Sequence, residues 1–288
     1  MEVWIGITIA AAFLQNLRSM LQKHLKARLS SLGATAIRFF FAMPLAWVLW
    51  AWLGEGFAFP ARFFMFTGLA AISQIIATLL LLYLFGLKNF AVGSTLARTE
   101  AVQTAIIGFV LLGDRVSLWA MVGILVSLVG VVLIAGKLRL AAIEARSVGI
   151  GLASGTSFAI ASVLYRAATQ TLESGGPIAH GAAVLLVATS FQSALLLAWF
   201  LIKDRPQLRA ILKNWRLGAL VGLTGGLASL GWFTAFSLQN AAYVKAVAQV
   251  EILFTLLASW LFFKETIRRI ELIGIVFIAS GILVLVLA

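Results

Sequence analysis

The chain has 288 residues, of which 62% are hydrophobic and 11% charged, and its mean hydropathy is +1.06. Soluble domains carry about 25% charged residues, so this composition excludes a soluble globular protein and makes the lipid bilayer the main solvent. The formal charge is +12, but the basic residues are spread over short loops without an aromatic platform, which argues against nucleic acid and favours anionic lipid headgroups as neighbours. Cysteine is absent, which excludes disulfides and thiolate metal sites.

Ten stretches are long and apolar enough to be membrane-spanning helices, since about 20 residues at 1.5 Å each cross about 30 Å of hydrocarbon. In chain order they are 3–22, 33–53, 63–85, 91–112, 116–135, 147–171, 181–202, 216–237, 244–263 and 271–287. The segments between them average roughly ten residues or fewer, which leaves no room for a soluble catalytic domain. The sequence therefore predicts an all-α polytopic membrane protein of ten transmembrane helices.

The chain repeats itself at an offset of 151 positions. The matched residues are Phe85, Leu87, Asn89, Ala91, Ala97, Glu100, Thr104, Gly123 and Gly130, which recur as Phe236, Leu238, Asn240, Ala242, Ala248, Glu251, Thr255, Gly274 and Gly281. We expect two halves, 1–140 and 147–288. Each half has five spans, an odd number, so the second half enters the membrane from the opposite side. Two inverted repeats around a central cavity are typical of secondary transporters that work by alternating access.

Basic residues gather in one set of loops. Fifteen Lys and Arg lie between spans 1–2, 3–4, 5–6, 7–8 and 9–10, whereas the opposite side holds only Arg62, Arg115, Arg166 and Lys245. By the positive-inside rule this distribution predicts cytoplasmic basic loops and both termini outside.

The fourth and fifth spans carry a pattern that both halves share. The first half reads Thr99-Glu100-Ala101-Val102, then Leu112-Gly113-Asp114-Arg115, then Gly123 and Gly130; the second reads Val250-Glu251-Ile252-Leu253, then Lys264-Glu265-Thr266, then Gly274 and Gly281. This pattern resembles the EamA module of the drug/metabolite transporter superfamily, in which a helix carrying Glu-Pro ends in Leu-Gly-Glu-Arg before a glycine-bearing helix. Arg38-Phe39, with Ala42 and Pro44, is similar to the second helix of that module.

The resemblance covers nearly the whole chain and implies ten helices. Because bacterial members export amino acids and other metabolites, it implies an exporter of aromatic and other amino acids in the bacterial inner membrane. The sequence departs from the family in two ways. Ala101 and Ile252 stand where the module has proline, so no helix break is expected there. The usual family topology has both termini in the cytoplasm, whereas the loop charges predict the reverse.

Ionisable residues in the fourth and ninth spans are the first candidates for a substrate site, because each costs about 2.5 to 3.5 kcal/mol to insert at mid-bilayer. Arg98 and Glu100 are two positions apart, about 200° around a helix, and are expected on different faces. On one face Ser94 and Arg98 match Lys245 and Gln249; on the other, Glu100 and Thr104 match Glu251 and Thr255.

We therefore predict that Arg98, Lys245 and Gln249 line the cavity and bind a substrate carboxylate. Glu100 and Glu251 bind the substrate ammonium or carry a coupling proton; the alternative is that each glutamate pairs with the threonine four residues on and locks helices together. In that alternative, Glu100→Gln leaves transport largely intact.

Further residues have a functional and a structural interpretation. Tyr83 and Trp232, together with Tyr165, Tyr243 and Phe236, form an aromatic cavity wall or anchor the membrane interface. Asn16, Gln74 and Ser157 are polar positions that can reach the cavity. Arg18 and Arg38 are expected to extend to lipid headgroups. The glycines spaced by seven favour close helix packing.

Other classes of function have less support. The only histidines, His24 and His180, lie near helix ends, and no metal-ligand or P-loop spacing occurs, so no catalytic residue, metal or cofactor is predicted. Without ATP machinery, uphill transport needs an ion or substrate gradient. The alternatives to amino-acid export are export of drugs, purines or other metabolites, or vitamin import; an integral-membrane lipid-modifying enzyme is the alternative of another class. The expected partners are a small-molecule substrate and the bilayer, with a monomer as the simplest assembly.

Overall fold

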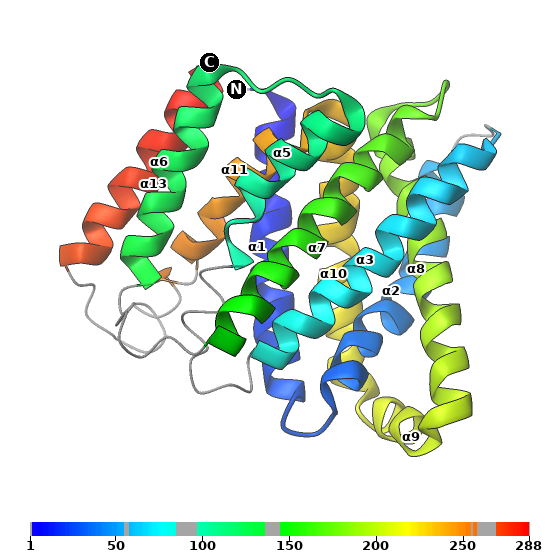
Figure 1. The fold of residues 1–288 in the computed structure, drawn as a ribbon. Helices are drawn as coiled ribbons and strands as arrows, with labels where there is room; N and C mark the ends of the chain where they lie inside the picture. Colours follow the sequence, from blue (N-terminus) through cyan, green and yellow to red (C-terminus); the bar gives the residue numbers. More distant parts are fainter. Residues whose placement is uncertain are drawn as a thin grey trace.

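The computed structural model describes residues 2–54, 58–84, 97–135, 145–254, 256–257 and 269–287, and these residues form helices and short connections without a strand. Figure 1 shows the helices side by side in one bundle. They are α1 (Val3–Leu25), α2 (Ser31–Leu53), α3 (Ala61–Leu84), α5 (Glu100–Leu112), α6 (Leu118–Ala135), α7 (Ala145–Gln170), α8 (Pro177–Lys203), α9 (Arg205–Lys213), α10 (Trp215–Leu238), α11 (Ala241–Val247), the 3₁₀ turn η2 (Ala248–Val250) and α13 (Arg269–Leu287).

Six of these helices are long and apolar enough to cross a membrane: α2, α3, α7, α8, α10 and α13. Helices α5 and α6 are shorter and also apolar. The expectation of an all-helical polytopic membrane protein is confirmed at this level. The predicted spans 91–112 and 244–263 lie partly outside the described residues, so the total of ten spans stays a prediction.

Helices α6 and α13, which occupy equivalent places in the repeat, pack against each other through their glycines. A Cβ added at Gly123 would lie 2.5 Å from the carbonyl oxygen of Gly281, and one at Gly130 would lie 2.5 Å from that of Gly274. Early residues of one helix therefore meet late residues of the other, so the pair is antiparallel. Because Gly123 matches Gly274 and Gly130 matches Gly281 in the repeat, the contact is also symmetric. Close packing was the structural interpretation of these glycines, and it is confirmed.

The remaining helices follow the same approximate two-fold relation. Helix α1 packs along α10, and its repeat partner α7 packs along α3, while α2 packs against α8. Two hydrogen bonds show that α3 and α7 are antiparallel: Ser154 donates to the carbonyl of Ala77 at 3.0 Å, and Ser73 donates to that of Ser157 at 2.8 Å. The contact between α1 and α10 is thus repeated by the contact between α7 and α3, their equivalents in the other half.

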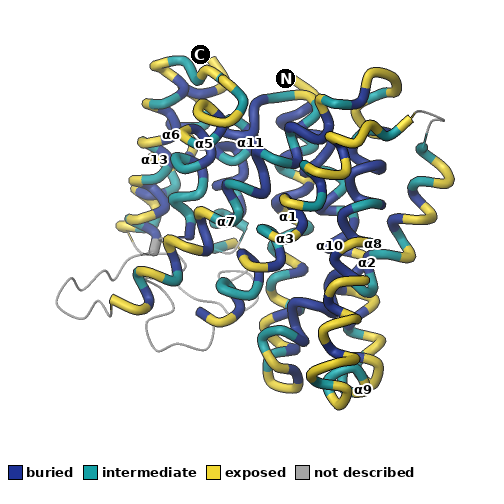
Figure 2. Tube along the Cα trace, turned by 45° about the vertical axis from the view of Figure 1, so that its right-hand side comes forward, coloured by how far each residue is buried: buried dark blue, intermediate teal, exposed yellow. Residues whose placement is uncertain are grey.

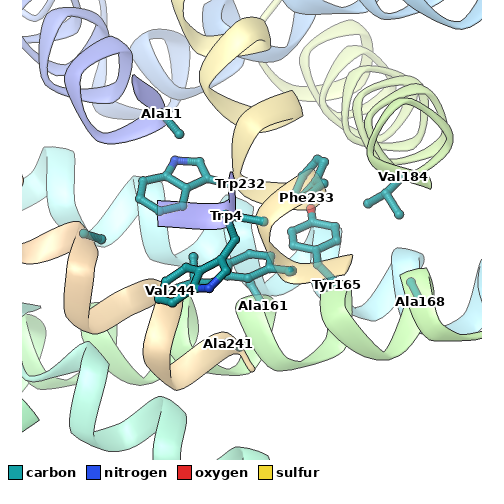
Figure 3. Packing of buried hydrophobic residues seen from close by; sticks show 14 of the residues in the cluster. Trp4, Ala11, Ala161, Tyr165, Ala168, Val184, Trp232, Phe233, Ala241 and Val244 are labelled. Carbon is teal, nitrogen blue, oxygen red and sulfur yellow. The ribbon is translucent and has the colours of Figure 1, made fainter. Parts of the chain in front are cut away.

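The buried core lies between the halves, and the outer surface is apolar. Figure 3 shows Trp232 and Phe233 of α10 among Trp4 of α1, Tyr165 of α7 and Val244 of α11. Figure 2 shows exposed positions along the outer helices, and large apolar residues such as Trp52, Leu118 and Ile202 are exposed. An apolar exterior around a packed interior is what a bilayer requires.

The two ends of the bundle differ in charge. Both chain termini lie at one end, and the basic helix α9 lies at the other (Figure 1). The connection that holds Lys26 and Arg28, between α1 and α2, is at the α9 end, because Arg28 Nη1 donates to Oδ1 of Asn214, which directly follows α9, at 3.3 Å. We call this end the basic end and the opposite one the terminal end. The structure thus places the termini opposite the basic connections that it describes, those after α1 and after α8, while the side of the membrane stays a prediction.

Candidate substrate site between the two halves

Helical hydrogen bonding is interrupted at equivalent places in the two halves. Arg98 and Thr99 form a turn before α5 begins at Glu100, and the 3₁₀ turn Ala248–Val250 precedes Glu251. Ala101 and Ile252 are themselves helical, as expected without proline, and the interruptions lie just before them. A 3₁₀ segment within a helix often marks a functional hinge, and broken helices form the substrate sites of many transporters.

Two ion pairs connect the halves beside these breaks. Arg98 Nη1 lies 2.9 Å from Glu251 Oε2, and Lys245 Nζ lies 2.7 Å from Glu100 Oε1. The side chains of Glu251 and Lys245 are 8% and 10% exposed, and those of Glu100 and Arg98 are 20% and 32% exposed. Each glutamate is paired with the cation of the opposite half. The expected separation of cations from glutamates is therefore wrong, because faces that diverge within one helix meet across the interface.

Gln15 of α1 and the aromatic residues of α10 extend this cluster. Gln15 Nε2 donates to Glu251 Oε2 at 3.2 Å, and Trp232 Nε1 donates to Gln15 Oε1 at 3.0 Å. Lys245 Nζ lies 4.8 Å from the ring centroid of Trp232 and 5.7 Å from that of Phe236. The cluster therefore combines two carboxylates, two cations, an amide and an aromatic face, and cation–π attraction holds the ammonium group against that face.

Comparison with known proteins identifies the family. A model described as the EamA-like transporter family matches residues 3–136 and 146–287. The chain belongs to the EamA-like transporter family. A solved structure titled only "Crystal structure of protein" superposes on this transporter with a TM-score of 0.75 at 15% identity, covering 99% of this chain and 98% of the other. At that identity the likeness shows the fold alone. No curated protein matches the transporter.

The structure brings most of the predicted site residues of this EamA-like transporter together, with two exceptions. Arg98, Lys245, Glu100, Glu251 and Trp232 form the cluster described above. Gln249, two residues before Glu251, is buried. Neither the oxygen nor the nitrogen of its amide has a hydrogen-bond partner among the described residues.

The exceptions are Asn16 and Tyr83. Asn16 is half-buried, but its neighbour Gln15 is the residue that bonds Glu251 and Trp232. Tyr83 is 38% exposed near the end of α3, and its hydroxyl accepts a hydrogen bond from Arg146 Nη2 at 2.5 Å, so it is not brought to the ion pairs. Gln15 directly precedes Asn16 and was not predicted; only the structure shows that its amide bonds Glu251 and Trp232.

The predicted hydrogen bond between glutamate and threonine side chains does not form in the first half. The hydroxyl of Thr104 donates instead to the backbone carbonyl of Glu100 at 2.7 Å, which leaves the carboxylate for Lys245. The matching Thr255 and the predicted face residue Ser94 lie outside the described residues.

A third ion pair ties the halves of the EamA-like transporter at the terminal end. Arg166 Nε donates to Asp114 Oδ2 at 2.8 Å, and Arg166 Nη1 donates to the carbonyls of Phe236 and Gln239 at 3.0 and 2.7 Å. Gly113, whose φ is 69°, ends α5 in the left-handed conformation that turns the chain toward this pair. Arg166 thus holds the loop after α5 against the last carbonyls of α10.

A tyrosine–glutamine network and two arginines lie inside the bundle. Tyr165 donates to Gln74 Oε1 at 3.0 Å, and Gln192 donates to the same oxygen at 2.9 Å, which joins α7, α3 and α8. Arg18 and Arg38 are each 3% exposed. The expectation that they extend to headgroups is wrong, because other helices cover both side chains.

Within the described ranges no group of His, Asp or Glu side chains is arranged to hold a metal ion.

Proposed function

We propose that this transporter is a secondary exporter of amino acids, with a range that includes aromatic and neutral ones, in the bacterial cytoplasmic membrane. One observation carries the proposal: the two half-buried to buried ion pairs, Arg98–Glu251 and Lys245–Glu100, that connect the halves beside their helix breaks. An amino acid carries one carboxylate and one ammonium group. It is therefore a chemical match for a site that offers both a cation and a carboxylate in a low-dielectric interior.

In this proposal, the substrate replaces the direct contact between Arg98 and Glu251, and this exchange links substrate binding to movement of the two halves. The guanidinium of Arg98 can bind the substrate carboxylate through two parallel hydrogen bonds, and Glu251 can then accept the substrate ammonium. Charge compensation is kept, because a buried charge left without a partner is strongly unfavourable. The direct link between the halves is replaced by links through the substrate, which frees the halves to rock about the cluster.

The apolar part of the substrate is expected to pack against Trp232 and Phe236. Their rings are 6.4 Å apart, and the amide of Gln249 lacks a partner among the described residues, so it is available to a substrate polar group. Glu100 and Glu251 are the residues on which a coupling proton can be carried. The Asp114–Arg166 pair would hold the terminal end closed while the substrate enters from the basic end.

The aromatic face also favours a second candidate, export of planar drugs or purines on the same fold. Trp232 beside Lys245 can stack with a planar ring without any need for a zwitterion. Transport of such a planar compound should depend on Trp232 and should be insensitive to removal of the Arg98 side chain.

Transport by liposomes that contain the purified protein tests the proposal. Uptake of labelled phenylalanine and alanine is measured with and without a pH gradient. We expect saturable uptake that Arg98→Ala lowers at least about tenfold in kcat/KM, since a factor of ten corresponds to about 1.4 kcal/mol of lost binding. Arg209→Ala, which removes an exposed cation of α9, is the matched control and should transport normally.

Acceleration by the pH gradient indicates proton coupling. Uptake no greater than in empty liposomes for every amino acid tested contradicts the proposal. In that case, competition by planar aromatic compounds supports the second candidate.

A further inference from the structure

Two buried arginines lie between the central ion pairs and the basic end. Arg18 is seven residues from the end of α1, and Arg38 is seven residues from the start of α2. At 1.5 Å per residue each lies about 10 Å inside the same end of the bundle. Each residue is 3% exposed, so these charges are inside the protein and not at its surface.

The two side chains lie against one small residue of α10. A Cβ added at Gly225 would lie 3.0 Å from Arg18 Cδ and 3.5 Å from Arg38 Cγ. The lack of a side chain at Gly225 therefore leaves room for both arginines. They are close enough for their positive charges to interact.

The hydrogen bonds of the two arginines differ. Arg38 donates to the hydroxyls of Thr78 and Ser229, both at 3.3 Å. Arg18 donates from Nη2 to Ser19, also at 3.3 Å, but its Nε and Nη1 are buried without a hydrogen-bond partner among the described residues. Buried N–H groups are nearly always paired, and a guanidinium is particularly unfavourable when it is not. The open donors of Arg18 need an acceptor.

The described side chains at this interface do not supply a balancing charge. Among the described residues, Glu251 and Glu100 form ion pairs with Arg98 and Lys245, and no ion pair joins Arg18 or Arg38 to a carboxylate. Glu251 interacts electrostatically with Arg18, but its Oε2 already accepts hydrogen bonds from Arg98 and Gln15. The described part of the interior therefore carries an excess of positive charge where water is scarce.

We propose that Arg18 and Arg38 form a buried binding site for the carboxylate of an organic anion, so that the cargo of this transporter must carry a carboxylate. The proposal rests on the transport function above and narrows its substrate class. Arg18 offers two free donors, and Arg38 adds charge from a position fixed by two hydroxyls. Planar guanidinium groups match carboxylate oxygens geometrically.

The place of the site in the fold gives it a role in the transport path. Gln15 is three residues before Arg18 on α1, so both side chains lie on the same face of that helix. Gln15 in turn bonds Glu251 of the central cluster. A carboxylate that enters from the basic end meets Arg18 and Arg38 first and then passes, one helical turn further, to Arg98. Carboxylates with a net negative charge are favoured by the excess of cations, and cations are excluded.

Three ligands that share a phenyl ring and differ in charge test the site: 3-phenylpropionate, phenylalanine and phenylalanine amide. Binding to the purified full-length protein is measured by calorimetry. We expect the two carboxylates to bind and the amide to bind at least tenfold more weakly. Arg18→Gln should weaken binding of 3-phenylpropionate at least tenfold, and Arg18→Lys should retain part of it.

Thermal stability distinguishes a binding role from a packing role. Arg18→Gln removes a buried charge that lacks a balancing partner, so the ligand-free variant should melt at the same temperature as the wild type or higher, whereas a packing role predicts a lower melting temperature. Gly225→Ala keeps both charges and crowds Arg18 Cδ, and it should also weaken binding of 3-phenylpropionate.

The outcomes separate this site from the proposed export function. Unchanged binding of 3-phenylpropionate by Arg18→Gln, together with transport of phenylalanine that depends on Arg98, overturns the site and leaves amino-acid export standing. Arg18-dependent binding of 3-phenylpropionate without any amino-acid transport supports the site and overturns the export function. Arg18-dependent binding of chloride or inorganic phosphate, with no binding of 3-phenylpropionate, overturns the assignment of an organic carboxylate.

Discussion

At the residue scale, the two central glutamates are equivalent in the repeat, but their cations are not. Arg98 of the first half corresponds to Gln249 of the second, and Lys245 of the second corresponds to Ser94 of the first. Each half therefore supplies one cation, from a different turn of the helix. Each glutamate receives one cation from the opposite half. The candidate site is thus neutral in its centre and asymmetric in its chemistry, and the proposed binding of a zwitterion uses this asymmetry.

A double-mutant cycle on Lys245 and Glu100 measures how strongly one of these pairs joins the halves. Each single change, Lys245→Gln or Glu100→Gln, leaves the partner charge without compensation, so both should lower the melting temperature of the detergent-solubilised protein. The double variant should recover part of the loss, with a coupling energy of about 0.5 to 3 kcal/mol. Additive losses would show that the ion pair contributes nothing to stability.

At the element scale, α6 and α13 form a rigid antiparallel pair, whereas the segments before Glu100 and Glu251 are interrupted. Glycines on α6 and α13 let the two backbones touch, and Ser127 adds a hydrogen bond from its hydroxyl to the carbonyl of Ile278 at 3.4 Å. The site lies on the interrupted segments and the scaffold on the close-packed pair.

Gly130→Ala tests the close contact of that scaffold. The new Cβ would lie 2.5 Å from the carbonyl oxygen of Gly274, so the helices must separate, and we expect a loss of about 1 to 3 kcal/mol of stability, the usual cost of overpacking. The matched control is Gly68→Ala in α3, where the added Cβ meets nothing within 4 Å and stability should be unchanged or slightly higher. Thermal melting in detergent compares the two, and equal melting temperatures would contradict the assigned packing.

At the scale of the whole molecule, the basic end and the terminal end give the transporter a direction. The proposed anion site lies about 10 Å inside the basic end by helix rise, and the Asp114–Arg166 pair joins the two halves at the terminal end. If the basic end faces the cytoplasm, as the positive-inside rule predicts, a cytoplasmic carboxylate meets cations first. Binding of the substrate from the cytoplasmic side first is what the proposed export requires.

Single cysteines introduced into this cysteine-free chain determine the orientation. Val3 is 74% exposed at the terminal end and Leu212 is 66% exposed on α9. In intact cells, a membrane-impermeant maleimide should label Val3→Cys directly and Leu212→Cys only after permeabilisation. The opposite pattern would contradict the loop charges and agree with the usual family topology.

The sequence by itself determined the class of protein, the repeat and its inversion. These follow from properties that are local or counted along the chain: apolar stretches of membrane length, an offset of 151 positions, and an odd number of predicted spans per half. It also pointed to Glu100, Glu251, Arg98 and Lys245, because charges in apolar helices are conspicuous.

Only the tertiary structure decided which charges meet. The pairing of Arg98 with Glu251, the contact of Gln15 with Glu251, and the burial of Arg18 beside Arg38 depend on how helices from opposite halves are apposed. Helical periodicity places each side chain on a face of its own helix but does not say which helix covers that face. The position of Arg18 near a helix end led to the prediction that its side chain contacts lipid headgroups. Instead, Gly225 on α10, more than 200 residues along the chain, provides the space in which the side chain is buried.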